Sequence, residues 1–163
     1  MSKRIEPGPH QESVWDYPRP PALETVEKRL RVVFNGETIA DTTNGYRVLE
    51  TSHPPTYYIP PEDIAMNYLN RKSRTSRCEF KGRAVYYSVT VGDRTVKQAG
   101  WAYPSPTQRF TEIADHVSFY ASKMDACFVG DGQARAQEGD FYGGWITESV
   151  VGPFKGGPGT LGW

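Results

Sequence analysis

The chain has 163 residues, which suits one domain with a hydrophobic core of its own. Its 19 basic and 19 acidic residues balance, so no long-range electrostatic field favours a nucleic acid or an anionic membrane as partner. There is no apolar run of membrane-spanning length and no apolar leader, and Cys78 and Cys127 form no local pair, so we expect a cytoplasmic protein with free thiols.

Residues 1–22 are polar and rich in proline, and they predict an extended arm ahead of a single β-rich domain over 23–163. Trp15 and Tyr17 are the aromatic residues of this arm, and we expect them to pack on the body or on a partner subunit. An arm too polar to fold alone often wraps a neighbouring subunit, which allows a homodimer.

Turn signals recur along the chain and indicate an antiparallel β core. Asn35-Gly36 is the strongest hairpin signal, and Gly92-Asp93 predicts a second hairpin with a two-residue turn. The strands that we expect cover residues 30–34, 37–41, 45–50, 80–91, 95–103, 125–129 and 141–147.

Two short helices are expected beside this core. Pro61 followed by two acidic residues is typical of a helix start, so a helix is expected over 61–70. Apolar residues at helical spacing predict a second helix over 107–120. A charged helical turn is expected over 23–29. The basic segment 71–77 is typical of a solvated loop, with a phosphate-binding loop as the alternative.

The most constrained stretch runs from Glu50 to Asp63, where two Pro-Pro pairs bracket a short tyrosine-rich strand. Because Glu50 and His53 are three residues apart, they would face opposite sides of a regular strand. We therefore predict that the strand ends near Glu50 and that His53 points into a concavity lined by tyrosines. There the two residues are candidates for acid–base catalysis. The alternative is that the imidazole only braces the Pro-Pro corner.

Several chemistries lack the residues that they need. The three histidines are far apart and no Cys-x-x-Cys occurs, so we expect neither a metal site nor another cofactor. The serine-hydrolase elbow and the Walker loop are absent as well. Lys81 and Lys155 each stand between a Phe and a Gly, and the two could bind one anionic group or be solvated. Cys78 is read as a structural thiol rather than a nucleophile, and Cys127 as core.

Several motifs together resemble one bacterial family, the domain of unknown function family four-two-seven. They are the segments 50–60, 80–82, 101–103, 115–120, 141–147 and 152–160. The resemblance covers nearly the whole chain and implies a compact fold of the β-tent type. Other branches of that fold often hold zinc through paired Cys-x-x-Cys, which this chain lacks. The family also carries a nucleotidyltransferase-like label, but the only acid-x-acid here is Glu138-Gly139-Asp140 and no Gly-Ser occurs.

The fold class that we predict is mainly β (α+β): a single β-tent-like domain of curved antiparallel sheets with two short helices. We expect a small-molecule pocket, in a binding protein or an enzyme, with His53 and Glu50 as catalytic candidates. The candidate ligand-binding residues are Tyr57, Lys81, Trp101, Tyr103, Tyr142, Trp145 and Lys155. The alternative is a non-enzymatic interaction or structural module in which these aromatic residues are core. The sequence does not identify the ligand.

Overall fold

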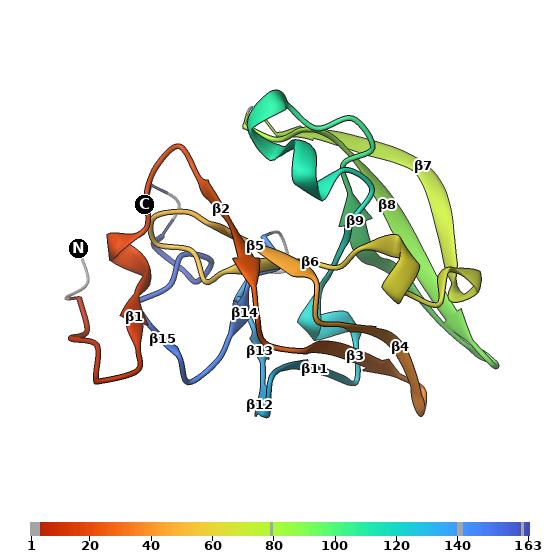
Figure 1. The fold of residues 1–163 in the computed structure, drawn as a ribbon, viewed down its shortest axis with the longest axis horizontal. Coiled ribbons are helices and arrows are strands. Elements are labelled where there is room, and N and C mark those ends of the chain that lie inside the picture. Colours follow the sequence, from red (N-terminus) through yellow and green to blue (C-terminus); the bar gives the residue numbers. More distant parts are fainter. Residues whose placement is uncertain (1–3, 79, 140–141, 161) are drawn as a thin grey trace.

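The structure is a computed structural model that describes residues 4–78, 80–139, 142–160 and 162–163. Strands dominate it, and they form several mostly antiparallel sheets rather than a closed barrel (Figure 1). The prediction of a single, mainly β domain is therefore confirmed. The helical elements of the described part are all 3₁₀ turns of three to six residues.

The central sheet carries the corner that the sequence singled out. Its strands run antiparallel in the order β2 (Ala22–Val26), β5 (Gly45–Leu49) and β6 (Thr56–Tyr58). Just beyond β6, Ile59 forms an antiparallel bridge with Val117. Val117 belongs to β10 (Val117–Phe119) of the neighbouring sheet. The chain at β6 therefore contacts β5 on one side and β10 on the other.

The second sheet contains the longest strands. It has the order β7 (Leu69–Cys78), β8 (Gly82–Val91), β9 (Arg94–Ala102) and β10 (Val117–Phe119), all antiparallel. The hairpin predicted at Gly92-Asp93 joins β8 to β9, and Gly92 has the positive φ of 62° that such a turn needs. β7 is an edge strand, so one of its sides is free for other contacts.

The third sheet contains the first predicted hairpin. Its order is β4 (Glu37–Thr42), β3 (Leu30–Phe34), β11 (Ala126–Val129) and β12 (Gly132–Gln133). Asn35 and Gly36, at the turn, have φ values of 48° and 81°, which confirms the hairpin read from this dipeptide. The buried residues of β3 alternate with half-buried ones, as its sequence predicted.

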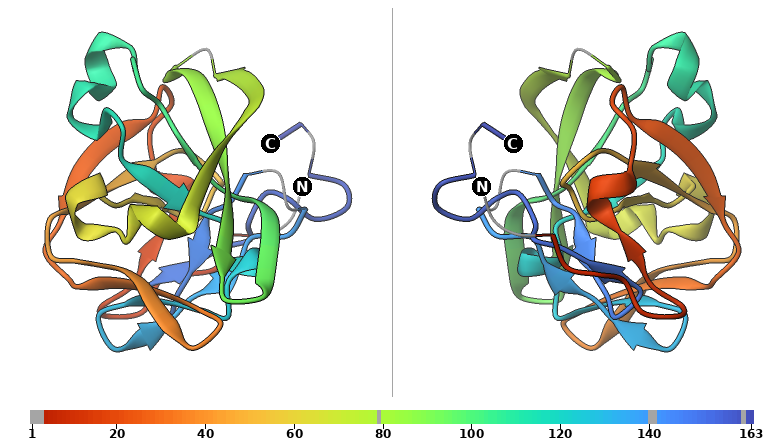
Figure 2. Two further views of the ribbon diagram at one scale, coloured as in Figure 1. Left: turned by 90° about the vertical axis from the view of Figure 1, so that its right-hand side faces the viewer. Right: turned by 90° about the vertical axis from the view of Figure 1, so that its left-hand side faces the viewer.

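Two pairs of short strands complete the structure. They are the antiparallel pair β13 (Arg135–Ala136) and β14 (Trp145–Ile146), and the parallel pair β1 (Glu12–Ser13) and β15 (Val150–Val151). The strand predicted over 141–147 is thus reduced to β14, and its first residue, Phe141, lies outside the described residues. Figures 1 and 2 show that the N- and C-terminal segments lie near each other, far from the β8–β9 turn.

The helix predicted over 61–70 does not form. The chain makes two separate 3₁₀ turns, η2 (Pro61–Asp63) and η3 (Met66–Tyr68), and then enters β7. The reason is tertiary: the amide of Ala65 donates to the carbonyl of Ile39 over 2.8 Å, a bond made to β4 rather than within a helix. The proline and the acids after it start a single turn, and contact with the sheet ends it.

Two further expectations for local structure are wrong. The segment 71–77, read as a loop, lies inside β7, and the helical turn expected over 23–29 is largely the strand β2. β7 has eight consecutive exposed residues from Asn70 to Arg77, so it shows no apolar alternation from which a strand could be recognised. Its pairing with β8 supplies the backbone partners instead.

The second predicted helix, over 107–120, is also wrong in its later part. Only η4 (Gln108–Ile113) is helical, and Asp115 then adopts a positive φ of 60°. From Val117 the chain pairs with β9 as β10, since the hydrogen bonds available at the sheet edge replace those of a helix. A last turn, η5 (Ala121–Lys123), comes after β10.

The sheets enclose a core rich in aromatic side chains. The largest side chains that are essentially inaccessible are Trp145, Tyr58, Phe34, Phe110 and Phe119. A separate apolar cluster joins the N-terminal segment to the body, with Val14 and Tyr17 buried against Leu49, Ile146 and Val150. The segment before β2 therefore packs on its own chain in this structure.

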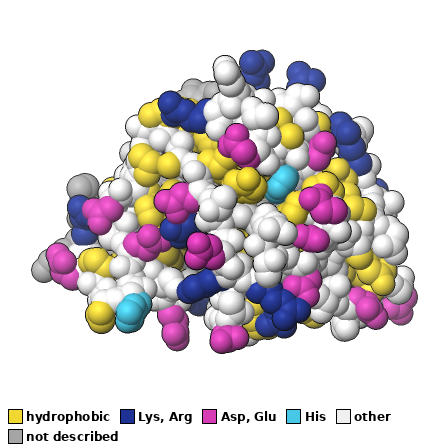
Figure 3. All heavy atoms as spheres, viewed as in Figure 1, with side chains coloured by type: hydrophobic (Ala, Val, Ile, Leu, Met, Phe, Trp, Pro, Cys, Tyr) yellow, Lys and Arg dark blue, Asp and Glu magenta, His cyan; other side chains and the backbone are white. Residues whose placement is uncertain are grey.

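The surface is mixed in charge. On the face shown in Figure 3, Lys and Arg side chains alternate with Asp and Glu over most of the area. No helix in the described part of the chain is long and apolar enough to cross a membrane.

Candidate functional site

The chain turns directly after β5, as the spacing of Glu50 and His53 predicted. The amide of His53 donates to the carbonyl of Glu50 over 3.0 Å, and Ser52 between them has a φ of 70°. Val14 and Lys155 both bind the backbone of this corner. The amide of Ser52 donates to the carbonyl of Val14, and the carbonyl of Ser52 accepts from the amide of Lys155. The corner is therefore fixed by backbone hydrogen bonds to the N-terminal segment and to the C-terminal tail.

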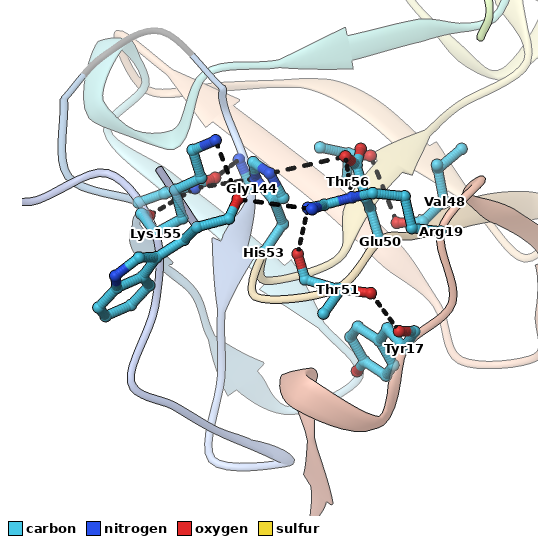
Figure 4. A network of polar contacts seen from close by, with 11 residues as sticks. Tyr17, Arg19, Val48, Glu50, Thr51, His53, Thr56, Gly144 and Lys155 are labelled. Carbon is cyan, nitrogen blue, oxygen red and sulfur yellow. Dashed lines mark hydrogen bonds and ion pairs between the residues drawn. The ribbon is translucent and has the colours of Figure 1, made fainter. Parts of the chain in front are cut away.

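The buried side-chain amide of Gln137 determines which nitrogen of the His53 ring carries the proton. Its Oε1 accepts from the Gly144 amide at 3.1 Å, while its Nε2 donates to the Lys155 carbonyl at 2.7 Å. These two backbone partners leave only one orientation of the side-chain amide. The same Nε2 lies 3.3 Å from Nδ1 of His53, so Nδ1 accepts and the proton of the neutral ring lies on Nε2. Figure 4 shows His53, Gly144 and Lys155 close together in this network.

The other nitrogen of His53 faces Glu50. The distance from Nε2 to Oε2 of Glu50 is 3.9 Å, and the same oxygen lies 3.4 Å from Nε of Arg19. Burial, together with the positive charges of Lys155, Arg19 and Lys81, lowers the pKa of His53 from 6.5 to about 4. The imidazole is therefore neutral at neutral pH and offers an N–H donor on this side.

A cavity of about 510 Å³ opens beside this corner. Aromatic side chains from two strands form much of its wall: Tyr58 from β6, Trp101 from β9, and Tyr103 just after β9. Nε1 of Trp101 donates to the Tyr58 hydroxyl at 3.3 Å, and the two rings meet edge to face with centroids 6.2 Å apart. Burial is the main cause that raises the pKa values of Tyr58 and Tyr103, so both phenols stay neutral.

The charged groups of the cavity are mostly positive. Its walls include Arg74, Arg77, Lys81 and Lys155, with Glu50 as the one carboxylate among the described lining residues. Burial disfavours the charged form of Lys81, but Tyr58, Cys78 and Glu50 outweigh it, and its pKa is raised. The Lys155 ammonium lies 5.3 Å from the centre of the Tyr142 ring.

The structure brings together most of the residues proposed from the sequence. Those that line the cavity are Glu50, His53, Lys81, Trp101, Tyr103, Tyr142 and Lys155. Tyr57 lies elsewhere, because neighbours in β6 point to opposite faces and Tyr58 takes the cavity side. Trp145 is fully buried, donates from Nε1 to the Phe119 carbonyl at 2.8 Å, and packs against Tyr57 with centroids 5.2 Å apart.

Several residues of the site were not proposed from the sequence. They are Tyr58, Cys78, Tyr86 and Tyr120 in the wall, Arg74 and Arg77 on β7, and Gln137 behind His53. Of these, Tyr58 could have been found as the alternative member of the tyrosine pair, and the two arginines as members of the basic segment. Gln137 stands in a polar stretch with no periodicity, so only the three-dimensional contact identifies it.

The donor groups do not fit the zinc that other branches of the implied fold hold. Within the described residues, no three or more His, Cys, Asp or Glu side chains come close enough to share a metal ion. The acid-x-acid of the sequence cannot be assessed as a pair, because Asp140 lies outside the described residues.

Comparison with known proteins identifies a family. A family model described as a domain of unknown function, DUF427, matches residues 22–130, and no curated protein matches the chain. The matched part contains the strands from β2 to β11, including the corner at His53 and the walls from β6 to β9. Gln137 and Lys155 lie beyond it.

Proposed function

The chain belongs to the DUF427 family, whose function is unknown, and we propose that it binds a small molecule in the cavity beside His53. The observation that carries this proposal is the make-up of the walls, since fixed aromatic rings alternate there with a few charged groups. Ligand sites commonly have this composition and a volume of roughly 300–1,000 Å³. The cavity, at about 510 Å³, lies within that range.

For His53 we propose a binding role rather than that of a general base. Gln137 occupies Nδ1, while Nε2 carries the proton of the neutral ring and lies 3.9 Å from Oε2 of Glu50, too far for a hydrogen bond. With a pKa near 4 the ring is too weak a base to take a proton efficiently at neutral pH. Its Nε2–H is suited to donating a hydrogen bond to a ligand. If the cavity also catalyses a reaction, Lys81 and Glu50 are the groups on its wall that could transfer a proton.

The alternative, an interaction or structural module, has less support. Such modules commonly expose an apolar patch for a partner. Among the residues that the structure describes, Ile5 is the only large hydrophobic side chain that is exposed. The aromatic side chains of the candidate site instead face the cavity or the core.

A thermal-shift screen against a metabolite library, with one variant that fills the cavity, tests the proposal. Ser76 lines the cavity from β7, so we expect Ser76→Trp to block it. Ser73 lies on the same exposed strand outside the cavity, which makes Ser73→Trp a matched control. A ligand should raise the melting temperature of the wild type and of Ser73→Trp, but not of Ser76→Trp. A library without hits, or hits that Ser76→Trp retains, would favour the interaction module.

Three further attributes belong to the same proposal. Residence in the cytoplasm is supported by the two cysteines, which are both unpaired. Membership of the β-tent class is supported by the antiparallel sheets that meet over an aromatic core. A homodimer is the third attribute, and light scattering would test it directly.

A further inference from the structure

We propose that the ligand of this cavity is a small organic anion, with a planar ring that bears a carboxylate or a phosphate. This inference rests on the proposed function, because it names the ligand class for the same cavity. Three features of the walls support it: an excess of positive charge, a lysine held inside the cavity, and aromatic surfaces beside it.

The excess of positive charge is local. The chain as a whole is neutral, with 19 basic and 19 acidic residues. The described lining contains four cationic side chains against one carboxylate, and that carboxylate, Glu50, already has Arg19 as partner at 3.4 Å. Across the described residues, none of the four cations forms an ion pair with an Asp or Glu side chain, and Lys155 Nζ donates to the main-chain oxygen of Trp163 at 3.4 Å. An anion entering the cavity would supply the missing negative charge.

Lys81 is held in place by its backbone. Its carbonyl accepts from the amide of Thr107 at 3.1 Å, and Gly82 after it has a φ of 107°, which suits only glycine well. The ammonium therefore projects from a fixed turn into a partly buried space. Tyr58, Cys78 and Glu50 outweigh the cost of burying this cation, so Lys81 keeps its charge and can pair with a bound anion.

Arg74 and Arg77 extend the positive charge toward the opening of the cavity. Both are exposed on the edge strand β7, and the Arg74 guanidinium lies 5.3 Å from the centre of the Tyr86 ring, which orients it. A guanidinium presents a planar set of donors that matches a carboxylate or a phosphate. The mixture of arginine at the opening and lysine inside is suited to attracting such a group and then holding it.

The aromatic walls account for the planar ring. Trp101 and Tyr103, which are 6% and 5% exposed, lie on the same cavity wall as Lys81, and ring-to-ring contacts stabilise a planar ligand. The inaccessible Tyr58 ring supports Trp101 edge to face. His53 adds a neutral hydrogen-bond donor for the ligand, the Nε2–H, since Gln137 contacts only its other ring nitrogen, Nδ1. A metal cation would meet the repulsion of four positive side chains, so the lining disfavours that class of ligand.

Matched pairs of small probes test the inference on the full chain by protein-observed NMR. The pairs are indole-3-carboxylate with indole-3-carboxamide, and phenyl phosphate with phenol; sodium sulfate reports binding of an inorganic anion alone. We expect each organic anion to shift amide signals of the cavity walls and to bind about tenfold more tightly than its neutral counterpart. Sulfate alone should bind more weakly than either organic anion, because it lacks the ring.

Charge-removing variants assign the effect to named residues. Lys81→Met removes the charge and keeps the aliphatic part of the side chain. Arg77→Gln removes a charge from an exposed position, so it leaves folding unaffected. Each should raise the dissociation constant of the anions about tenfold. Lys97→Met, at an exposed position of β9 outside the cavity, is the matched control and should change it less than about twofold.

The outcomes separate this inference from the proposed function. If the neutral probes shift the same signals with equal affinity, the anion class is wrong although the pocket stands. If no probe shifts any signal of the cavity, both are overturned. Anion binding that neither Lys81→Met nor Arg77→Gln weakens would overturn the assignment to these residues.

Discussion

The side-chain amide of Gln137 donates to Nδ1 of His53 from 3.3 Å, across 84 residues of sequence. Gln137 is itself held by the Gly144 amide and by the Lys155 carbonyl, and it is only 3% exposed. The hydrogen bond fixes both the ring orientation and the tautomer of His53. It also couples the Pro-Pro corner to the tail of the chain, so that His53 and Lys155 are positioned by one buried group.

Changing this amide to a carboxylate should alter the protonation of His53. In Gln137→Glu an acceptor replaces the donor, so the protonated ring gains a partner and its pKa rises above about 4, by roughly one unit or more. An NMR titration of the His53 ring protons would measure the shift. Gln133→Glu adds the same charge at an exposed position of β12 and should leave the titration unchanged. An unaltered pKa in Gln137→Glu would contradict the hydrogen bond.

The lowered pKa of His53 also predicts how stability depends on pH. Between the folded value of about 4 and the ordinary value of 6.5, the unfolded chain binds a proton that the folded chain does not. The free energy of unfolding therefore falls as the pH decreases through this window, by roughly 2 kcal/mol between pH 6.5 and 5. Urea denaturation at several pH values should show this slope in the wild type, and should show it much reduced in His53→Asn.

One control variant and the pH window itself make the experiment specific to His53. His10→Asn removes an exposed histidine and should retain the wild-type slope. The pKa of Asp41 is lowered by Arg29, and that of Asp125 by the amide of Asn35 and by Arg94. Stability from these two groups is lost only as the pH falls below about 3.8, outside the window used. A slope equal in the wild type and in His53→Asn would contradict a buried neutral His53.

The wall formed by Trp101 should depend on a glycine that lies against it. Gly143 has a φ of 75°, and a Cβ there would clash with the Trp101 ring. Gly36 has a similar φ of 81°, and a Cβ built there meets no atom within 4 Å. Gly36→Ala therefore measures the cost of the left-handed backbone alone, about 1 kcal/mol of the free energy of unfolding. In denaturant unfolding, Gly143→Ala should reduce the free energy of unfolding by about 1–3 kcal/mol more than Gly36→Ala does, because the indole of Trp101 must move. Equal losses in the two variants would show that Trp101 does not pack against Gly143.

The sequence identified the parts of the fold whose signals are local. Asn35-Gly36 and Gly92-Asp93 need positive φ values at their turns, and both hairpins occur where these dipeptides predict them. The helix over 61–70 failed because Pro61 and the acids after it specify one turn only, and the hydrogen bond from Ala65 to Ile39 then directs the chain along the sheet. β7 was missed because an exposed, basic edge strand has no apolar period.

In the site as well, the sequence predicted the features that depend on neighbouring residues and missed those that depend on strand pairing. The three-residue spacing of Glu50 and His53 predicted the turn, since no regular strand could place them together. The choice between Tyr57 and Tyr58 depended on which face of β6 meets the cavity, and that is set by pairing with β5 rather than by the tyrosines. Trp101 and Tyr103, two residues apart, reach the same wall as the strand period requires.

The two cysteines should differ in reactivity, because only one reaches the cavity. Cys78 is half-buried on the cavity wall, where a reagent that enters the cavity can reach its thiol. Cys127 is 1% exposed, and burial raises its pKa to about 12. Iodoacetamide should therefore modify Cys78 in the folded protein and Cys127 only after unfolding, as peptide mass spectrometry would report. Equal modification of both thiols in the folded protein would contradict this account.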